Sequence, residues 1–127
     1  AENLPFKKFV FDYVIVSFGL RNFNDIPESL EQIYRVLKKR GTFICLEFSE
    51  VNNPIFRNIV KAYFKTIPKL GQFFANNKFA YDYLVESILN FPNQVQLTKK
   101  LTLAGFKTVK VIDIIDGVAA IHISKKQ

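Results

Sequence analysis

The feature of the sequence that most constrains the fold is an apolar run near its amino terminus. From Phe9 to Phe18 every residue is apolar except Asp12 and Ser17, and Val, Ile, Phe and Tyr predominate. The run has no helical periodicity and is typical of a strand in a parallel sheet with helices on both faces. We therefore expect a strand buried on both faces, within an α/β fold.

Polar residues follow this strand at once. Ser17, Gly19, Arg21 and Asn22 form a polar cluster at its carboxyl end. In open α/β sheets, ligands bind beyond the carboxyl ends of the strands. The polar cluster is therefore the first candidate site.

A helix is predicted directly after the polar cluster. Asp25 and Glu28 have the spacing of a capping box, and Leu30–Leu37 carries an apolar stripe at helical spacing. The basic residues Lys38–Arg40 suit the negative end of the helix dipole, and Gly41 suits a left-handed helix stop.

Thr42–Phe48 has the composition of a second buried strand, so the segment is predicted to form a right-handed βαβ unit. Adjacent strand ends would then bring Glu47 and Ser49 into one crevice with the polar cluster. Glu47 also has a structural interpretation, in which it pairs with a neighbouring cation.

A helix is predicted to open at Asn53-Pro54, since proline is tolerated in a first turn. Apolar residues between Ile55 and Ile67 form one face, and a basic row recurs every four residues on the other. An ordinary solvated face explains this row, and contact with a membrane surface is the alternative. The basic row is Arg57, Lys61 and Lys65.

This helix is expected to break at Pro68 and Gly71. Residues 72–80 are aromatic without a regular period, and Asn76-Asn77 is the expected turn. Helical spacing resumes at Tyr81 and continues to Pro92.

The last part of the chain is predicted to form a helix and two strands. Asn93 and Gln96 make a capping box, and Gly105 ends the helix. Asp116-Gly117 is a strong hairpin signal. His122, the single histidine, is expected to be a packed or edge residue and not a catalytic one. The expected strands are Lys107–Ile115 and Val118–Ser124.

Composition limits the class of protein. The 127 residues suffice for one domain or half of a larger one, and the absence of methionine suggests a piece of a longer chain. A net charge of +7 is compatible with membrane surfaces, phosphates or nucleic acid as partners, although an ordinary solvated basic surface is the preferred explanation. The single cysteine, Cys45, excludes a disulfide framework and favours a reducing compartment.

Several site classes have no support in the sequence. The five glycines are scattered and form neither GxGxxG nor a P-loop, and no cluster has metal-ligand spacing. No apolar run is long enough to span a membrane. Lys7-Lys8 before the apolar run imitates a signal peptide, but Asp12 interrupts the run and Arg21-Asn22 replaces a cleavage site.

Four motifs occur in order along the chain: AENLPF (1–6), FGLRN (18–22), RVLKKRGTFICLEFS (35–49) and YDYLVESILNFPNQ (81–94). Together they closely resemble the carboxyl-terminal half of the ubiquinone/menaquinone biosynthesis C-methyltransferases. This resemblance implies a class I, Rossmann-like methyltransferase fold: two parallel strands and a terminal antiparallel hairpin, flanked by helices, in a single partial domain over residues 1–127.

The resemblance also implies roles for individual residues. Ala1 and Ser17 would contact S-adenosyl-L-methionine (SAM), the co-substrate. Arg21 and Asn22 would meet the acceptor ring and, with Glu47, are the candidate catalytic residues.

The predicted acceptor is a polyprenyl benzoquinol or naphthoquinol, which is methylated at a ring carbon. Phe18, Ser49 and Tyr81 would lie on the substrate side, with no metal involved. Expected partners are a membrane surface and a homodimer or quinone-synthesis complex. Nucleic acid is not expected, because the aromatic residues lie on core-type stripes.

The expected location is the cytoplasmic side of a bacterial membrane or the matrix face of the mitochondrial inner membrane.

The sequence departs from the family at Lys39-Arg40, where Pro-Gly is usual. It also lacks the family's amino-terminal half with the glycine-rich SAM loop, so the isolated chain is expected to be inactive. The alternatives are a non-catalytic methyltransferase-like subunit or membrane scaffold in quinone synthesis, and a basic membrane- or nucleic-acid-binding module.

Overall fold

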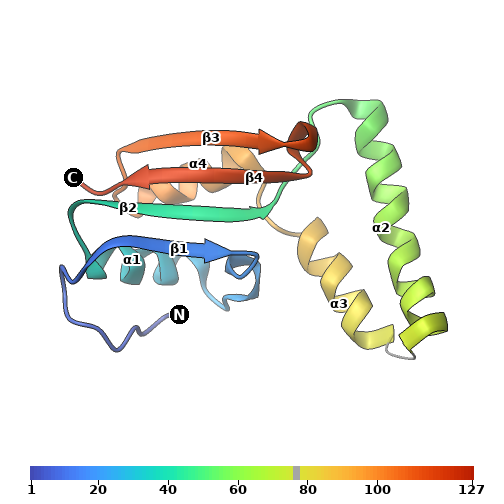
Figure 1. Ribbon diagram of the computed structural model, residues 1–127, viewed down its shortest axis with the longest axis horizontal. Coiled ribbons are helices and arrows are strands. Elements are labelled where there is room, and N and C mark those ends of the chain that lie inside the picture. The colour runs from blue at the N-terminus through green and yellow to red at the C-terminus, as the bar shows by residue number, and fades with distance from the viewer. Residues whose placement is uncertain (76–77) are drawn as a thin grey trace.

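The computed structural model describes residues 1–75 and 78–127, with the backbone alone described for residues 67–75, 78 and 108 (Figure 1). Four strands and four α-helices, with two short 3-10 turns, make up the described fold. In chain order they are β1 (Phe11–Ser17), η1 (Leu20–Asn22), α1 (Ile26–Val36), β2 (Leu37–Phe48), α2 (Pro54–Ala75), α3 (Lys78–Leu89), α4 (Gln94–Leu103), β3 (Thr108–Ile114), η2 (Ile115–Gly117) and β4 (Ala119–Lys125).

The strands form one mixed sheet in the order β1-β2-β4-β3. β1 and β2 are parallel and joined through α1, whereas β4 runs antiparallel to both β2 and β3. The α/β class, the parallel pair and the terminal antiparallel hairpin predicted from the sequence are confirmed.

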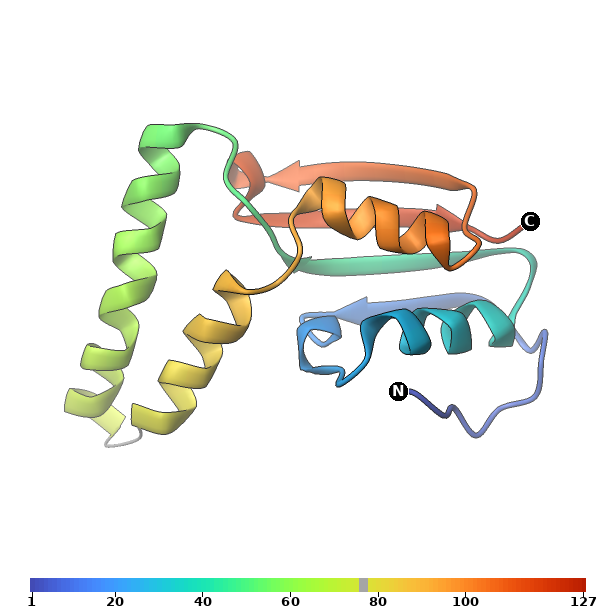
Figure 2. The same cartoon turned by 180° about the vertical axis from the view of Figure 1, so that it is seen from behind.

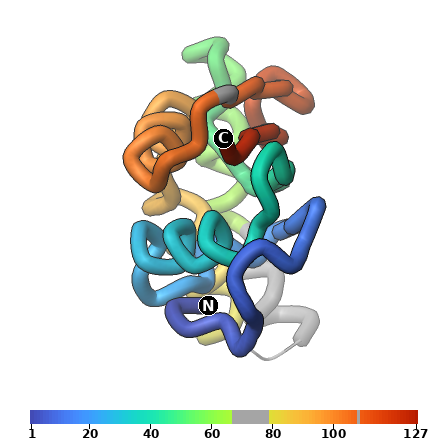
Figure 3. The backbone as a smooth tube through the Cα atoms, turned by 90° about the vertical axis from the view of Figure 1, so that its left-hand side faces the viewer, coloured from blue at the N-terminus to red at the C-terminus, as the bar shows by residue number. Residues whose placement is uncertain are grey.

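One face of the sheet is covered by α1 and α4, which lie side by side in front of the strands in Figure 2. Figure 3, which looks along the strands, shows the same two layers. The buried core between the layers contains residues of both helices and of β2. Its members include Leu30, Ile33, Phe43, Cys45, Leu97, Leu101 and Phe106.

The opposite face of the sheet is open, and here the sequence prediction for the first strand is wrong. Tyr13 is 65% exposed and Ile15 is 67% exposed. Val14 and Val16 alternate with them and pack against the core. β1 is an edge strand with a single helix layer over it, so only alternate side chains are buried within this chain.

The predicted end of the first helix is also wrong, because α1 stops at Val36 and Leu37 already belongs to β2. Between Leu37 and Thr42 the register of β2 against β1 shifts, which places Lys38–Gly41 in an irregularity of the strand. Arg40 has the left-handed φ of 64°. Gly41 is required for space, because a Cβ there would lie 2.8 Å from the Lys38 carbonyl oxygen.

The start of α1 is confirmed in part. Oδ1 of Asp25 accepts a hydrogen bond of 2.9 Å from the Glu28 backbone N–H, as expected for an N-cap. The reciprocal bond of the predicted capping box comes from another residue: the Asp25 N–H donates to Oε1 of Glu2 at 3.0 Å.

α2 and α3 form an arm that extends beyond the end of the sheet (Figure 1). The predicted break at Pro68 and Gly71 is wrong, since α2 continues to Ala75. Proline fixes φ at a helical value and removes one backbone donor, so a helix can pass through it at the loss of a hydrogen bond. Residues 72–75 and 78–80 are helical, not irregular, and the predicted turn at Asn76-Asn77 lies outside the described residues.

The face of α2 predicted to be apolar and packed is divided. Val60 and Phe64 are half-buried, whereas Ile55, Ile59 and Tyr63 are exposed. α2 stands beside α3 at the end of the sheet, so only one side of the helix has a neighbour (Figure 1).

The predictions for the last part of the chain are largely confirmed. The Asn93–Gln96 capping box opens α4, and Gly105 follows its end with a φ of 106°. β3 and β4 form the hairpin, although its turn includes Ile115 as well as Asp116-Gly117, all with positive φ.

Candidate functional site

The loop after β1 is fixed to the end of β2 by a buried ion pair. Nη1 of Arg21 donates to Oε1 of Glu47 at 2.9 Å and to the Phe18 carbonyl oxygen at 2.7 Å. The Arg21 backbone N–H lies 3.3 Å from Oε2 of the same Glu47. The Glu47 side chain is 2% exposed and that of Arg21 is 11% exposed. The structure therefore brings together two of the three predicted catalytic residues.

Both carboxylate oxygens of Glu47 are engaged. In addition to the Arg21 contacts, Oε1 accepts a 3.1 Å hydrogen bond from the Phe48 N–H. This geometry suits a residue that holds Arg21 and its loop.

The guanidinium of Arg21 has a buried N–H group that makes no hydrogen bond among the described residues. Its carbon lies 5.5 Å from the centroid of the Phe48 ring, a cation–π distance. Its Nε is buried and has no hydrogen-bond partner among the described residues. Guanidinium is a donor without acceptor atoms, so the remaining capacity of Arg21 is that of a donor.

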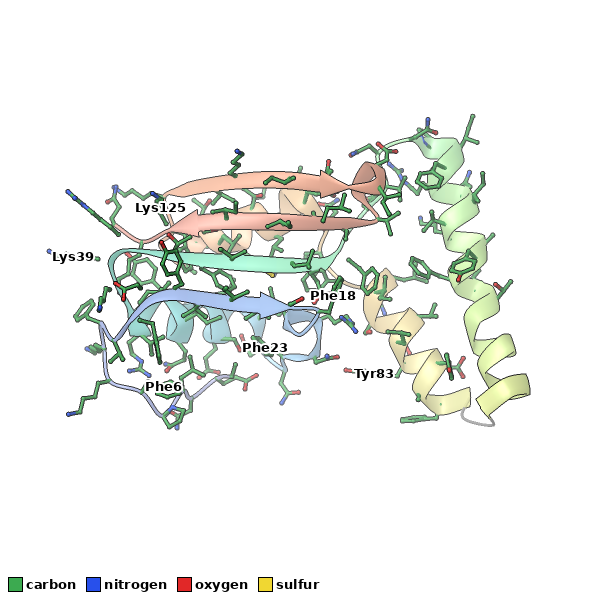
Figure 4. All side chains as sticks on the ribbon, viewed as in Figure 1. Phe6, Phe18, Phe23, Lys39, Tyr83 and Lys125 are labelled. Atoms are coloured by element: carbon green, nitrogen blue, oxygen red, sulfur yellow. The ribbon has the colours of Figure 1, made fainter. Side chains whose placement is uncertain are left out.

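Asn22, the third predicted catalytic residue, is exposed at the end of η1 and bonded to the arm. The Tyr83 hydroxyl donates to Oδ1 of Asn22 at 2.9 Å. Figure 4 shows Tyr83 on α3 and Phe18 at the carboxyl end of β1. α3 thereby reaches the loop that carries Arg21.

Sequence reasoning named Tyr81 and missed Tyr83. Tyr81 shares helical spacing with the buried residues Val85 and Ile88, which indicates packing, and it is half-buried. Tyr83 falls outside that stripe. The sequence does hold a signal for Tyr83, which is a tyrosine on the polar side of a helix that the family resemblance places near the substrate.

Phe18 turns the chain from β1 into η1. Its φ is 51°, its N–H donates to the Leu46 carbonyl oxygen at 2.8 Å, and its own carbonyl receives Arg21. Its ring lies 4.9 Å from that of Phe48. Ser17, the preceding residue, is exposed at the end of β1.

Ser49 and Ala1 make no hydrogen bond or ion pair with this group. Oγ of Ser49 is buried without a hydrogen-bond partner among the described residues, and Ser49 lines a cavity of about 240 Å³ between the end of β2 and the arm. The Ala1 amine pairs with Glu2 at 2.8 Å.

Cys45 and the acidic side chains of the described residues offer no second candidate site. Burial, with the negative charge of Glu47, raises the pKa of Cys45 to about 12, so its thiol stays protonated at neutral pH. The described residues contain no group of three or more His, Cys, Asp or Glu side chains placed to hold a metal ion. No helix in the described ranges is both long and apolar enough to cross a membrane.

Sequence comparison relates the whole chain to one family. The profile of the ubiE/COQ5 methyltransferase family matches residues 1–126. The chain is 46% identical to the ubiquinone/menaquinone biosynthesis C-methyltransferase UbiE of Rickettsia bellii, over 99% of this chain and 51% of the relative.

Two relatives from other sources give similar values. A mitochondrial 2-methoxy-6-polyprenyl-1,4-benzoquinol methylase of Xenopus laevis is 45% identical, over 96% of this chain and 40% of the relative. A demethylmenaquinone methyltransferase of Staphylococcus saprophyticus is 43% identical, over 99% and 54%. The chain spans about half the length of the curated relatives it matches.

Solved structures share the fold at low identity. A SAM-dependent methyltransferase of Thermotoga maritima superposes with a TM-score of 0.71 at 21% identity, over 99% of this chain and 61% of that one. PigF in complex with SAH gives a TM-score of 0.57 at 15% identity, over 91% and 30%. The chain has the fold of SAM-dependent methyltransferases and belongs to the ubiE/COQ5 methyltransferase family.

Proposed function

We propose that this chain is the acceptor-side half of a SAM-dependent C-methyltransferase that methylates a ring carbon of a polyprenyl benzoquinol or naphthoquinol. The observation that carries the proposal is the loop after β1, where the buried Arg21–Glu47 pair fixes the backbone and Asn22 remains exposed. Relatives named for a benzoquinol and for demethylmenaquinone support a quinol acceptor of either ring type.

The reaction needs donors beside a ring oxygen. A ring carbon becomes nucleophilic when a neighbouring hydroxyl ionises, so groups that stabilise the resulting oxyanion lower the barrier. SAM supplies a methyl group bound to a positively charged sulfur. A ring carbon–methyl bond forms, the methyl–sulfur bond breaks, and the ring carbon then loses its proton. Arg21 and Asn22 supply donors for the oxyanion, and the proton released from the ring carbon passes to solvent.

Glu47 has a positioning role in this proposal, not that of a base. Its two oxygens already receive the Arg21 side chain, the Arg21 N–H and the Phe48 N–H. These hydrogen bonds support a role for Glu47 in holding the loop after β1.

The residues of this chain fit one side of a SAM site. The Ser17 hydroxyl is exposed at the carboxyl end of β1, where class I folds bind ligands. Residues 1–127 contain no glycine-rich loop for the remainder of SAM. We therefore propose that the amino-terminal half present in the relatives completes the site. We expect calorimetric titration to detect no SAM binding by the isolated chain.

The arm supports a further proposal, contact with a membrane surface where such a lipid acceptor lies. Ile55, Ile59 and Tyr63 form an exposed apolar row on α2, and Lys61 and Lys65 are exposed elsewhere on the same helix. α2 contains no acidic residue. Basic helices with an apolar row bind anionic interfaces. This proposal places the protein at the cytoplasmic face of a bacterial membrane or the matrix face of the mitochondrial inner membrane.

The function is tested with the full-length protein, in which this chain follows its amino-terminal half. It is incubated with methyl-labelled SAM and short-chain demethylated benzoquinols or naphthoquinols, and products are identified by mass spectrometry. We expect label on the ring carbon of one quinol. The matched oxidised quinones, which have no hydroxyl to ionise, should give no product. SAM binding without transfer to any quinol would instead support a non-catalytic subunit.

A further inference from the structure

We propose that Tyr83 is a positioning residue that orients the Asn22 amide, so that the NH2 group of Asn22 faces the acceptor oxygen. The proposal rests on the function proposed above and adds a rule for the protonation state of the ring that the site accepts.

The hydrogen bond at 2.9 Å from the Tyr83 hydroxyl to Oδ1 of Asn22 carries the argument. A carboxamide has an acceptor end and a donor end. When the hydroxyl occupies the oxygen, the Nδ2 hydrogens are the part of the Asn22 side chain that remains for a ligand.

The backbone beneath Asn22 is already fixed, so rotation of its side chain is the freedom that Tyr83 removes. The Asn22 N–H donates to the Gly19 carbonyl oxygen at 3.1 Å and closes η1. The preceding residue, Arg21, is held by Glu47 through its side chain and its N–H.

Neither side chain then presents a free acceptor to a ligand. Arg21 has no acceptor atom, and the acceptors around it, Glu47 and the Phe18 carbonyl, already receive its hydrogens. With the Asn22 oxygen also engaged, the edge formed by Arg21 and Asn22 favours an oxygen that only accepts. An ionised ring hydroxyl is such an oxygen, whereas a neutral hydroxyl also has a proton to donate. Tyr83 thus selects the ionised ring.

The direct test measures the ionisation of a bound ring without catalysis. A nitrophenol analogue of the quinol, whose ionised form absorbs visible light, is titrated in complex with the full-length protein. We expect the wild-type protein to lower the pKa of the bound phenol. Tyr83→Phe should reduce the ionised fraction at fixed pH about three- to tenfold, the usual value of one hydrogen bond.

The matched control is Tyr34→Phe, the same chemical change on α1. The Tyr34 ring contacts Phe106 and Lys126, and phenylalanine preserves those contacts. This variant should leave the pKa of the bound phenol unchanged. An equal shift in both variants, or none in Tyr83→Phe, would overturn the proposal.

Kinetics give an independent readout. Tyr83→Phe should lower kcat about three- to tenfold and move the acidic limb of its pH profile upward, with the KM for SAM unchanged. Asn22→Asp keeps an oxygen for Tyr83 but replaces the NH2 donor, and it should lose both phenol ionisation and turnover. A Tyr83→Phe effect confined to KM or to thermal stability would contradict the proposal. An inactive wild-type protein that still ionises the phenol would contradict the proposed reaction, not the role of Tyr83.

Discussion

Nη1 of Arg21 lies 2.9 Å from Oε1 of Glu47. This contact joins the loop after β1 to the carboxyl end of β2, at a point that is almost closed to solvent. Two strand ends that are adjacent in the sheet are thereby locked at the site itself. A residue expected from the sequence to face the substrate is also part of the framework that supports it.

Substitution of Arg21 should consequently reduce stability as well as rate. Arg21→Ala leaves the Glu47 carboxylate buried without its charge partner, and such changes cost about 3–5 kcal/mol. Arg21→Met with Glu47→Gln removes both charges and should recover most of this loss. Chemical denaturation of the full-length variants measures the effect. A loss below about 1 kcal/mol in Arg21→Ala would show that the pair is not a structural clamp.

His122 should make stability decline in weak acid. Burial lowers its pKa, and the smaller opposing effects come from the Gln94 carbonyl and Asp113. The unfolded chain takes up a proton near the ordinary value of 6.5 while the folded chain remains neutral, so stability is full above that pH and falls below it. His122→Asn should show a shallower decline in free energy of unfolding between about pH 7 and pH 5. Identical slopes in the two proteins would contradict this.

The open face of the sheet should make the isolated 127-residue chain self-associate and bind hydrophobic dyes. Ile15→Glu places a charge on that face and should reduce both effects. Leu103→Glu is the matched control, because Leu103 is 87% exposed on α4, on the other side of the sheet. Sedimentation over a concentration series checks the result. A monomer without dye binding, or equal effects of the two substitutions, would oppose it.

Membrane contact through α2 should depend on its lysines. Lys61→Gln with Lys65→Gln should weaken binding to anionic vesicles about tenfold or more at low salt, since each charge contributes ~1 kcal/mol. Lys99→Gln with Lys107→Gln removes the same charge from exposed sites outside α2 and should have less effect. Equal losses in co-sedimentation would indicate a general charge effect without a role for the arm.

Local signals in the sequence predicted the parts of the fold that depend on neighbouring residues. The Asn93–Gln96 box and the Asp116-Gly117 turn depend on backbone conformation and short-range hydrogen bonds, and both were placed correctly. The exposure of Tyr13 depends on which helices cover the sheet, which an apolar run does not encode. Pro68 was expected to end a helix, but proline removes only one donor and the rest of α2 continues.

For the candidate site, too, the sequence predicted the contact that follows from strand order and not the contact that depends on how the helices pack. Arg21 and Glu47 were expected to meet because parallel neighbouring strands end at one edge. The contact between Tyr83 and Asn22 was not, since it depends on how the arm folds back toward η1. Helical spacing separated Tyr83 from the packed stripe but gave no information about its partner.

β2 and β4 pair in the middle of the sheet, although α2, α3, α4 and β3 all lie between them in the chain. The hydrogen bonds between β2 and β4 therefore close a long loop of chain, and the arm formed by α2 and α3 is part of that loop. The entropy of closing such a loop grows slowly, by about 0.6 kcal/mol for each doubling of length. Insertions and deletions in the arm would then have little effect on the free energy of unfolding of the sheet, so the arm can vary in length between species while the sheet is retained.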